Sequence, residues 1–262
     1  MSKLLASVMS VEEAQIALDY GADIIDCKDP SSGALGALPN ETISEIVKVV
    51  ASRRPVSATI GDLPMQPYLI FEAVKSKLET GVDFVKVGFF PDGNSPYHET
   101  LSLRANAKQS PTESNACRCI TRLNPLASRT SLIAVLFADQ NPDLNLLPLV
   151  ADTGFAGIML DTADKGQGGL RRCVSHELLA RFISRAKSLG LMTGLAGSLK
   201  VEDVPSLLEL GPDYLGFRGA LCETARANAI RHHNVTEIAN AMSLARSSRS
   251  GLKSASPTSV LV

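Results

Sequence analysis

The chain has 262 residues, 45% of them hydrophobic and 20% charged, and its net charge of −1 without any basic block excludes the electrostatic footprint of a nucleic-acid-binding protein. No apolar run reaches the ~18 residues that a membrane helix needs, and the first residues do not read as a secretory signal. The five scattered cysteines form no disulfide framework, so we expect a cytoplasmic protein that binds neither nucleic acid nor membrane.

Short apolar runs with strand character alternate with amphipathic helical stretches along the whole chain. The first helical stretch opens with a capping box, Ser10-Val-Glu-Glu13. The predicted strands are Leu4–Met9, Asp23–Lys28, Pro55–Gly61, Phe84–Phe90, Ser131–Ala138, Gly157–Thr162, Met192–Ser198 and Tyr214–Ala220. Eight strand–helix units in about 250 residues predict a single-domain (β/α)8 TIM barrel, with the doubly wound parallel sheet as the structural alternative.

One sequence phrase recurs and favours the barrel. The segment "VEEAQIALDYGADIIDCK" at 11–28 aligns without gaps on "VEDVPSLLELGPDYLGFR" at 201–218, and "LETGVDFVKVG" at 78–88 repeats the same phrase. In each, a helix ends at a glycine, such as Gly21 or Gly211, and an aspartate then leads into a strand. Equivalent units spaced around the chain indicate a closed barrel rather than an open sheet.

The alternation of side chains across a strand then predicts which residues point into the barrel. Asp26 and Lys28 share one face of their strand, whereas Ile25 and Cys27 face the surrounding helices. The same register places further residues inward near the mouth: Lys86, Gly88, Met159, Asp161, Gly216, Arg218 and, in the third strand, Ser57 and Thr59. Because barrel enzymes carry their chemistry at the C-terminal ends of the strands, these polar side chains predict a site there.

Lys28 and Lys86 are candidates for covalent chemistry on carbonyl compounds. A lysine inside a barrel and close to a second cation can lose its proton and attack an aldehyde as a neutral amine. Lys86, Lys165 and Arg218 could supply the neighbouring charge, whereas Asp26 would act in the opposite direction. The alternative is a pair of buried salt bridges, such as Asp26–Lys28 and Lys86–Asp161, that only stabilise the mouth.

Small residues after the last two strands predict a phosphate site. The segments "LAGSLK" and "FRGAL" occupy the two places where TIM barrels commonly hold phosphate through backbone amides, although such segments are also ordinary strand ends. The candidate substrate-binding and phosphate-binding residues are Gly197, Ser198, Arg218, Gly219, Ser57 and Thr59.

Two regions depart from the repeating pattern. Residues 92–129 form a polar connection that is longer than one helix needs, and we expect a helix with a loop there. From Ser247 onward the chain has too few large apolar residues to order itself. The expected organisation is therefore a catalytic barrel domain over residues 1–246 and a flexible tail over residues 247–262.

The segments "GADIIDCKDPSSGALGA", "PVSATIGDLP", "DFVKVGF", "DTADKG", "LAGSLK" and "GFRGAL" occur in this order between residues 4 and 222. Together they resemble the (5-formylfuran-3-yl)methyl phosphate synthases, also called 4-(hydroxymethyl)-2-furancarboxaldehyde-phosphate synthases. The first two segments are specific to that family, whereas the last two are common in phosphate-binding barrels. Cys27, the polar 92–129 connection and the serine-rich tail depart from the family pattern.

The resemblance implies a barrel lyase that joins two molecules of glyceraldehyde 3-phosphate into a phosphorylated furan aldehyde, with loss of one phosphate and water. The product is the furan precursor of methanofuran, or of its analogue in methylotrophic bacteria, and serves one-carbon metabolism. The family's Schiff-base lysine falls on Lys28 and its acid/base lysine on Lys86, with supporting residues on Asp26, Asp161 and Lys165.

Neither a metal nor an organic cofactor is expected. Cys117-x-Cys119 has no matching second pair, and no glycine-rich dinucleotide fingerprint follows a strand. Two other functions stay open, a generic lysine-dependent aldolase acting on sugar phosphates and a non-catalytic barrel that binds a phosphorylated metabolite. The outer helices also predict a homo-oligomer, without giving the number of subunits.

Overall fold

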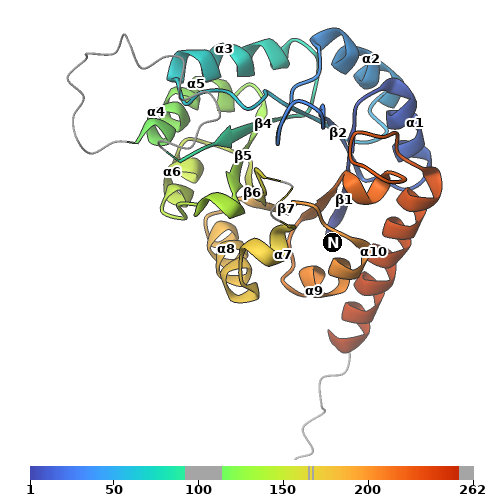
Figure 1. Ribbon diagram of the computed structural model, residues 1–262. Helices are drawn as coiled ribbons and strands as arrows, with labels where there is room; N and C mark the ends of the chain where they lie inside the picture. Colours follow the sequence, from blue (N-terminus) through green and yellow to red (C-terminus); the bar gives the residue numbers. More distant parts are fainter. Residues whose placement is uncertain (92–113, 165, 167, 254–262) are drawn as a thin grey trace, which may run out of the picture.

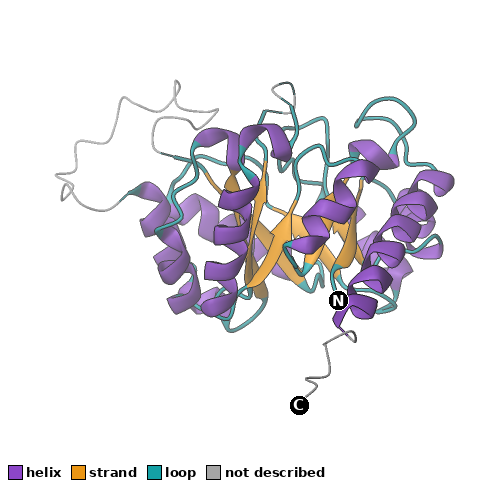
Figure 2. Cartoon of the chain, turned by 90° about the horizontal axis from the view of Figure 1, so that it is seen from below, coloured by secondary structure: helices purple, strands orange, loops and turns teal. Residues whose placement is uncertain are grey.

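Eight parallel strands close into a barrel in sequence order in the computed structural model, which describes residues 1–91, 114–164, 166 and 168–253. The helices surround this barrel, as Figure 1 shows along the barrel axis and Figure 2 shows from the side. The strands are β1 (Lys3–Val8), β2 (Ile24–Cys27), β3 (Val56–Thr59), β4 (Phe84–Phe89), β5 (Ser131–Phe137), β6 (Gly157–Asp161), β7 (Met192–Leu195) and β8 (Tyr214–Phe217). The predicted TIM barrel is confirmed.

The helices cover the outside of the barrel and connect successive strands. They are α1 (Val11–Asp19), α2 (Asn40–Val50), α3 (Pro67–Leu78), α4 (Asn115–Arg122), α5 (Asn124–Ala127), α6 (Leu146–Asp152), α7 (Leu170–Cys173), α8 (His176–Ser188), α9 (Val204–Glu209) and α10 (His232–Lys253), with 3-10 turns η1 (Ala138–Gln140), η2 (Val201–Asp203) and η3 (Gly219–Leu221). Within the described ranges, no helix combines the length and the apolar character that crossing a membrane requires.

The two regions that depart from the repeat are described only in part. Helices α4 and α5 lie in the C-terminal part of the 92–129 connection, whereas residues 92–113 lie outside the described residues. Helix α10 continues to Lys253, past the domain boundary expected at residue 246. The remainder of the expected tail, residues 254–262, lies outside the described residues.

The recurring helix–glycine–aspartate phrase has a structural purpose in each unit. Its glycines have positive φ angles, +111° at Gly21 and +73° at Gly211, which a side chain would strain. The aspartate that follows accepts a hydrogen bond from a backbone amide near the start of the preceding strand. These bonds, 2.7–2.8 Å long, run from Leu4 to Asp23, from Val56 to Asp83 and from Thr193 to Asp213. The phrase therefore ties β1 to β2, β3 to β4 and β7 to β8 at the N-terminal end of the barrel.

The strand register places the polar residues in the barrel interior as the alternation predicts. Asp26 lies opposite Ser57, and Thr59 lies opposite Lys86. The side chains of Asp26 and Lys86 are almost completely buried, and so are the alternate residues Ile25, Cys27, Val85 and Val87. β2 and β4 therefore each carry charge on one face and apolar side chains on the other.

Candidate active site

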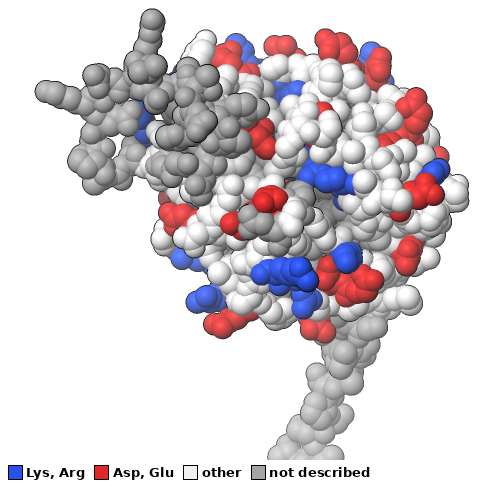
Figure 3. Space-filling model, viewed as in Figure 1, with Lys and Arg blue, Asp and Glu red and all other residues white. Residues whose placement is uncertain are grey.

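A cavity of about 290 Å³ opens at the C-terminal ends of the strands, near the lower limit of the ~300–1,000 Å³ that small-molecule sites occupy. Figure 3 looks along the barrel axis and shows basic side chains beside a central hollow. Both predicted lysines line this cavity, together with Asp161, Gly197, Ser198 and Gly219. Residues that lie far apart in the sequence therefore share one small cavity.

Lys86 extends from β4 to a carboxylate that lies deeper in the barrel. Its Nζ is 2.7 Å from Oδ1 of Asp26, and both side chains are nearly inaccessible to solvent. Two hydroxyl groups donate to the same carboxylate, Ser7 at 2.8 Å and Ser57 at 2.6 Å. Asp26 is thus surrounded by donors from β1, β3 and β4, and it fixes the position of the Lys86 amine.

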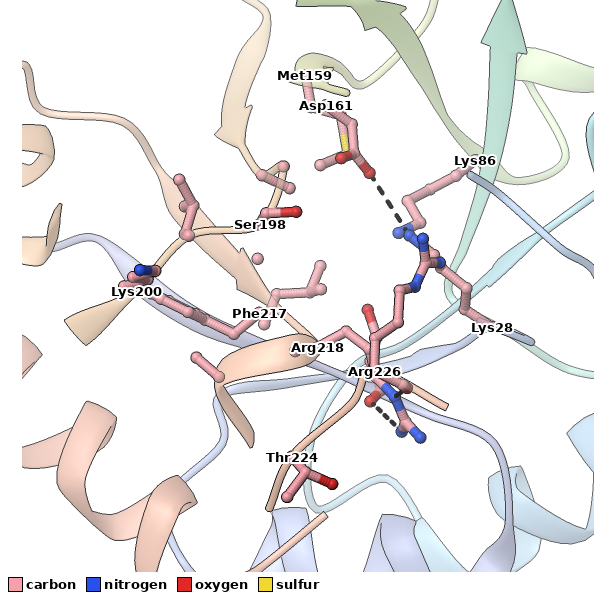
Figure 4. A pocket seen from close by; sticks show the side chains of 18 residues that line it. Lys28, Lys86, Met159, Asp161, Ser198, Lys200, Phe217, Arg218, Thr224 and Arg226 are labelled. Carbon is pink, nitrogen blue, oxygen red and sulfur yellow. Dashed lines mark hydrogen bonds and ion pairs between the residues drawn. The ribbon is translucent and has the colours of Figure 1, made fainter. Parts of the chain in front are cut away.

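Lys28 reaches across the barrel lumen toward the opposite wall. It follows the end of β2, and its Nζ lies 3.5 Å from Oδ2 of Asp161 at the end of β6 (Figure 4). The other oxygen of Asp161 accepts the backbone amide of Thr162 at 2.7 Å, which orients the carboxylate. Lys28 is 5% exposed, so its amine lies at the cavity wall rather than in bulk water.

Both lysines form buried ion pairs, but their partners differ from those expected for the salt-bridge alternative. Lys86 pairs with Asp26 and Lys28 pairs with Asp161, instead of Asp26 with Lys28 and Lys86 with Asp161. The reason is the depth of Asp26 in the barrel. It lies two residues before Lys28 and therefore further from the mouth, where the long Lys86 side chain reaches it across β3. Each lysine therefore has its own carboxylate, which can exchange a proton with it.

The environment of Asp26 favours its charged form. Burial would raise the pKa of this carboxyl, but the charges of Lys86 and Lys28 and the hydrogen bonds from Lys86 and Ser57 hold it below the ordinary value of 3.8. Asp26 is therefore an anion at neutral pH.

This arrangement predicts that Asp26→Asn destabilises the fold by about 3–5 kcal/mol at pH 7, because the substitution leaves a buried ammonium without its counter-charge. The pKa of Asp26 is lower in the folded than in the unfolded protein. Its contribution to the free energy of unfolding is therefore complete at pH values above the unfolded-state pKa, and it is lost as the pH falls through the folded-state pKa. Urea unfolding of both proteins at several pH values measures this difference. A difference that stays constant down to pH values far below 3.8 would contradict the assignment.

Cys27 is not a competing nucleophile. Its thiol belongs to the β2 face opposite Asp26, is fully buried and shows no opening toward the cavity. Burial and the neighbouring Asp26 charge raise the pKa of this thiol, so it stays protonated and unreactive. The packing role predicted for Cys27 fits these surroundings.

The predicted hydroxyl and glycine ligands divide into two groups. Ser57 is committed to Asp26, and Thr59 Oγ1 donates to the Gly36 carbonyl at 2.9 Å, where it holds the loop between β2 and α2. Gly197 and Ser198 line the cavity with positive φ angles of +113° and +49°. A Cβ atom at Gly197 would lie 2.9 Å from Thr162, so only glycine fits at this close approach.

Arg218 occupies a different position from the one that its register suggests. Arg218 follows β8 and lines the cavity, but its guanidinium pairs with the buried carboxylate of Glu13 on α1. It also donates to the backbone carbonyl groups of Ser7, Arg226 and Asn228. Its hydrogen-bonding groups are therefore directed into the protein, whereas the sequence predicts Arg218 as a phosphate-binding residue.

Two cationic side chains at the cavity were missed by the sequence reasoning. Arg226, in the connection between η3 and α10, and Lys200, after β7, both line the cavity (Figure 4). Neither lies on a strand, so no alternation pattern could place it. Lys165, which was predicted as a supporting residue, lies outside the described residues.

The described part of the chain contains no group of three or more His, Cys, Asp or Glu residues that could hold a metal ion. The cavity is instead lined by the amines of Lys28, Lys86 and Lys200, the carboxylate of Asp161 and the guanidinium of Arg226, and the Asp26 carboxylate lies behind Lys86. Amines and carboxylates at this spacing can form an imine with an aldehyde and can move protons next to it.

A family model described as "4-HFC-P synthase" matches residues 4–239. The chain is 36% identical over 248 residues to the (5-formylfuran-3-yl)methyl phosphate synthase of Methanopyrus kandleri, covering 92% of this chain and 98% of that one. It is 36% identical over 230 residues to the synthase of the same name from Methanocaldococcus jannaschii, covering 86% and 92%.

Among solved structures, the phosphoribosylanthranilate isomerase of Thermotoga maritima superimposes with a TM-score of 0.61 at 12% identity, covering 93% of this chain and 99% of that one. A likeness at this low identity shows the barrel fold alone.

Proposed function

Because this chain belongs to the 4-HFC-P synthase family, we propose that it condenses two molecules of glyceraldehyde 3-phosphate to (5-formylfuran-3-yl)methyl phosphate through an imine on Lys28. The atoms balance when two triose phosphates give the furan, one inorganic phosphate and two waters. The product would be the furan precursor of methanofuran or of a methanofuran analogue. The observation that supports this proposal most strongly is the pair of inward amines, each with its own carboxylate, in one cavity.

Lys28 is proposed as the nucleophile. Transfer of its proton to Asp161 leaves a neutral amine, which attacks the triose aldehyde and forms a C–N bond. The resulting carbinolamine loses its hydroxyl group as water and becomes an iminium ion. This cation draws electrons from the adjacent carbon, so the proton on C2 becomes acidic enough to remove.

Lys86 is proposed as the acid/base group. It lies on β4, separated from β2 by one strand, and Asp26 holds its amine in the barrel interior. Proton transfers are required when the enamine forms, when the new C–C bond closes and when each water leaves the ring. A positioned amine with an adjacent carboxylate can serve these transfers in both directions.

The retained phosphate is proposed to bind at the loops after β7 and β8. Gly197, Ser198, Gly219 and Lys200 line the cavity, and Figure 4 shows Ser198 and Lys200 on the same side of it. Close backbone approach and a nearby ammonium are the features that phosphate sites of barrels use. The homo-oligomer predicted from the sequence remains a prediction.

The test is product analysis with glyceraldehyde 3-phosphate as the only substrate. The expected result is a near-ultraviolet absorption from the furan aldehyde and one inorganic phosphate released for each furan formed. A generic aldolase would consume the triose without furan absorption or phosphate release. A non-catalytic barrel would leave the triose unchanged.

A further inference from the structure

The structure of the product indicates which of the two phosphates must leave. In (5-formylfuran-3-yl)methyl phosphate, the three carbons that include the formyl group carry no phosphate, and the other three carbons carry the phosphate that remains. The triose whose aldehyde survives as the formyl group is the one that loses its phosphate, and in the proposed reaction this triose is the one held as an imine. The leaving phosphate must then lie close to Lys28, apart from the site of the retained phosphate.

Arg226 occupies such a position. In Figure 4 its side chain extends into the cavity beside Lys28, on the side away from Ser198 and Lys200. Its Nη2 donates to the carbonyl of Gly33, at a distance of 3.0 Å, in the loop between β2 and α2. Of the five N–H donors of a guanidinium, this is the one with a bonded acceptor among the described residues, so further donors are available to a ligand.

The charges around Arg226 show that it belongs to the same electrostatic unit as the catalytic groups. Burial lowers the pKa of this guanidinium and Asp161 acts in the opposite direction, with smaller effects from Arg218, Asp62 and Asp29. An arginine remains protonated under such shifts. The guanidinium is therefore a permanent cation near the carboxylate that pairs with Lys28.

All three guanidinium nitrogens of Arg218 donate to acceptors within the protein, and two of these bonds hold the segment that carries Arg226. Its Nε donates to the Arg226 carbonyl at 2.7 Å and its Nη2 donates to the Asn228 carbonyl at 2.8 Å. Glu13 receives both terminal nitrogens of Arg218, and it also accepts the backbone amides of Met9 and Ile230. The buried Glu13–Arg218 pair thus connects α1, β8 and the segment before α10.

We infer that Arg226 binds the phosphate that leaves the imine-bound triose, and that Glu13 and Arg218 act as positioning residues for it. This inference rests on the function proposed above. Removal of the C2 proton by a base turns the iminium into an enamine, whose electron pair expels phosphate from C3. The C3–O bond breaks with its electrons on the phosphate oxygen, where the Arg226 donors meet the developing charge.

The experiment compares borohydride trapping of two aldehydes, glyceraldehyde 3-phosphate and unphosphorylated glyceraldehyde. In the unchanged protein, trapping should saturate at a much lower concentration of the phosphorylated aldehyde. Arg226→Ala should raise that concentration by about 10- to 100-fold, because charge-assisted hydrogen bonds to phosphate are lost, and should leave trapping of glyceraldehyde unchanged. Arg226→Lys should restore part of the preference.

Arg231→Ala is the matched control, because Arg231 follows on the same segment and its side chain bonds to the exposed Glu223. This variant should keep the full preference for the phosphorylated aldehyde. Inorganic phosphate should also inhibit trapping of glyceraldehyde less strongly in Arg226→Ala than in the unchanged protein. An Arg226→Ala protein with the original preference and the original inhibition would overturn the inference.

The positioning role has its own readout. Glu13→Gln should weaken trapping of glyceraldehyde 3-phosphate while leaving trapping of glyceraldehyde unchanged, as in Arg226→Ala. A purely structural role would lower the melting temperature without changing the preference between the aldehydes, and would refute the positioning role. If the unchanged protein traps neither aldehyde, the proposed function fails. If the unchanged protein traps both aldehydes and the Arg226 variants behave like it, the inference about Arg226 fails and the proposed function stands.

Discussion

Replacing Lys28 by arginine should lower furan formation by about 10⁴-fold or more, the largest effect we expect from any single substitution. Arginine keeps the positive charge and can still pair with Asp161, but it stays protonated and cannot form an imine. The lower rate would therefore result from the missing imine and not from a change in charge. Steady-state absorbance of the furan aldehyde with glyceraldehyde 3-phosphate measures it.

Lys187→Arg provides the control for this substitution. Lys187 lies on α8, is 43% exposed in its side chain, and pairs with Asp213 at 3.6 Å, away from the cavity. This variant should keep its activity and its melting temperature. A Lys28→Arg protein with more than about one hundredth of the original rate would contradict covalent catalysis by Lys28, since electrostatic effects alone can retain that much.

Replacing Lys86 by methionine should separate acid/base chemistry from imine formation. Methionine has a similar length but carries no proton, so turnover should fall by about 10²- to 10⁴-fold, the usual contribution of a positioned acid or base. The imine on Lys28 should still form, because its amine and Asp161 are unchanged. Borohydride trapping and furan absorbance, measured on the same sample, test both statements.

A second variant tests whether destabilisation of the fold, rather than a missing acid/base group, explains the loss of turnover in Lys86→Met. Lys86→Met leaves the buried Asp26 carboxylate without its cation, which destabilises the fold. The double variant Asp26→Asn with Lys86→Met removes both charges and should recover stability relative to Lys86→Met. If the double variant also recovered turnover, Lys86 would be a structural residue and not the acid/base group.

The four charges in the barrel lumen are costly to bury, and this cost is itself informative. Pairs of buried ions commonly stabilise a fold no better than apolar side chains of the same size. Two amines and two carboxylates in the interior of a closed barrel are therefore better explained by chemistry than by stability.

The barrel, its strand order and the inward residues of β2, β4 and β6 could be predicted from the sequence, because they depend on local patterns. The repeated glycine and aspartate identify the starts of β2, β4 and β8, and alternation then places Asp26, Lys86 and Asp161 inside. These residues lie within strands, so the backbone direction alone decides which way their side chains point.

The exact ion pairs and the arginine positions could not be predicted in the same way. Which carboxylate a long lysine reaches depends on the stagger between strands, and this exchanged the partners of Lys28 and Lys86. Arg218 follows the end of β8, where its backbone leaves the strand conformation and its side chain turns to Glu13. Arg226 lies in an irregular segment, so its approach to Lys28 is a matter of tertiary structure.

The most direct test of the account is to locate the covalent adduct. The protein is incubated with glyceraldehyde 3-phosphate, reduced with borohydride and digested with trypsin, which cannot cleave after a modified lysine. The account predicts an uncut peptide spanning residues 4–48 that has gained the mass of the triose phosphate less one oxygen at Lys28, or that mass after loss of phosphate. An adduct located on any other residue, or one that persists at the same yield in Lys28→Arg, would contradict the central claim.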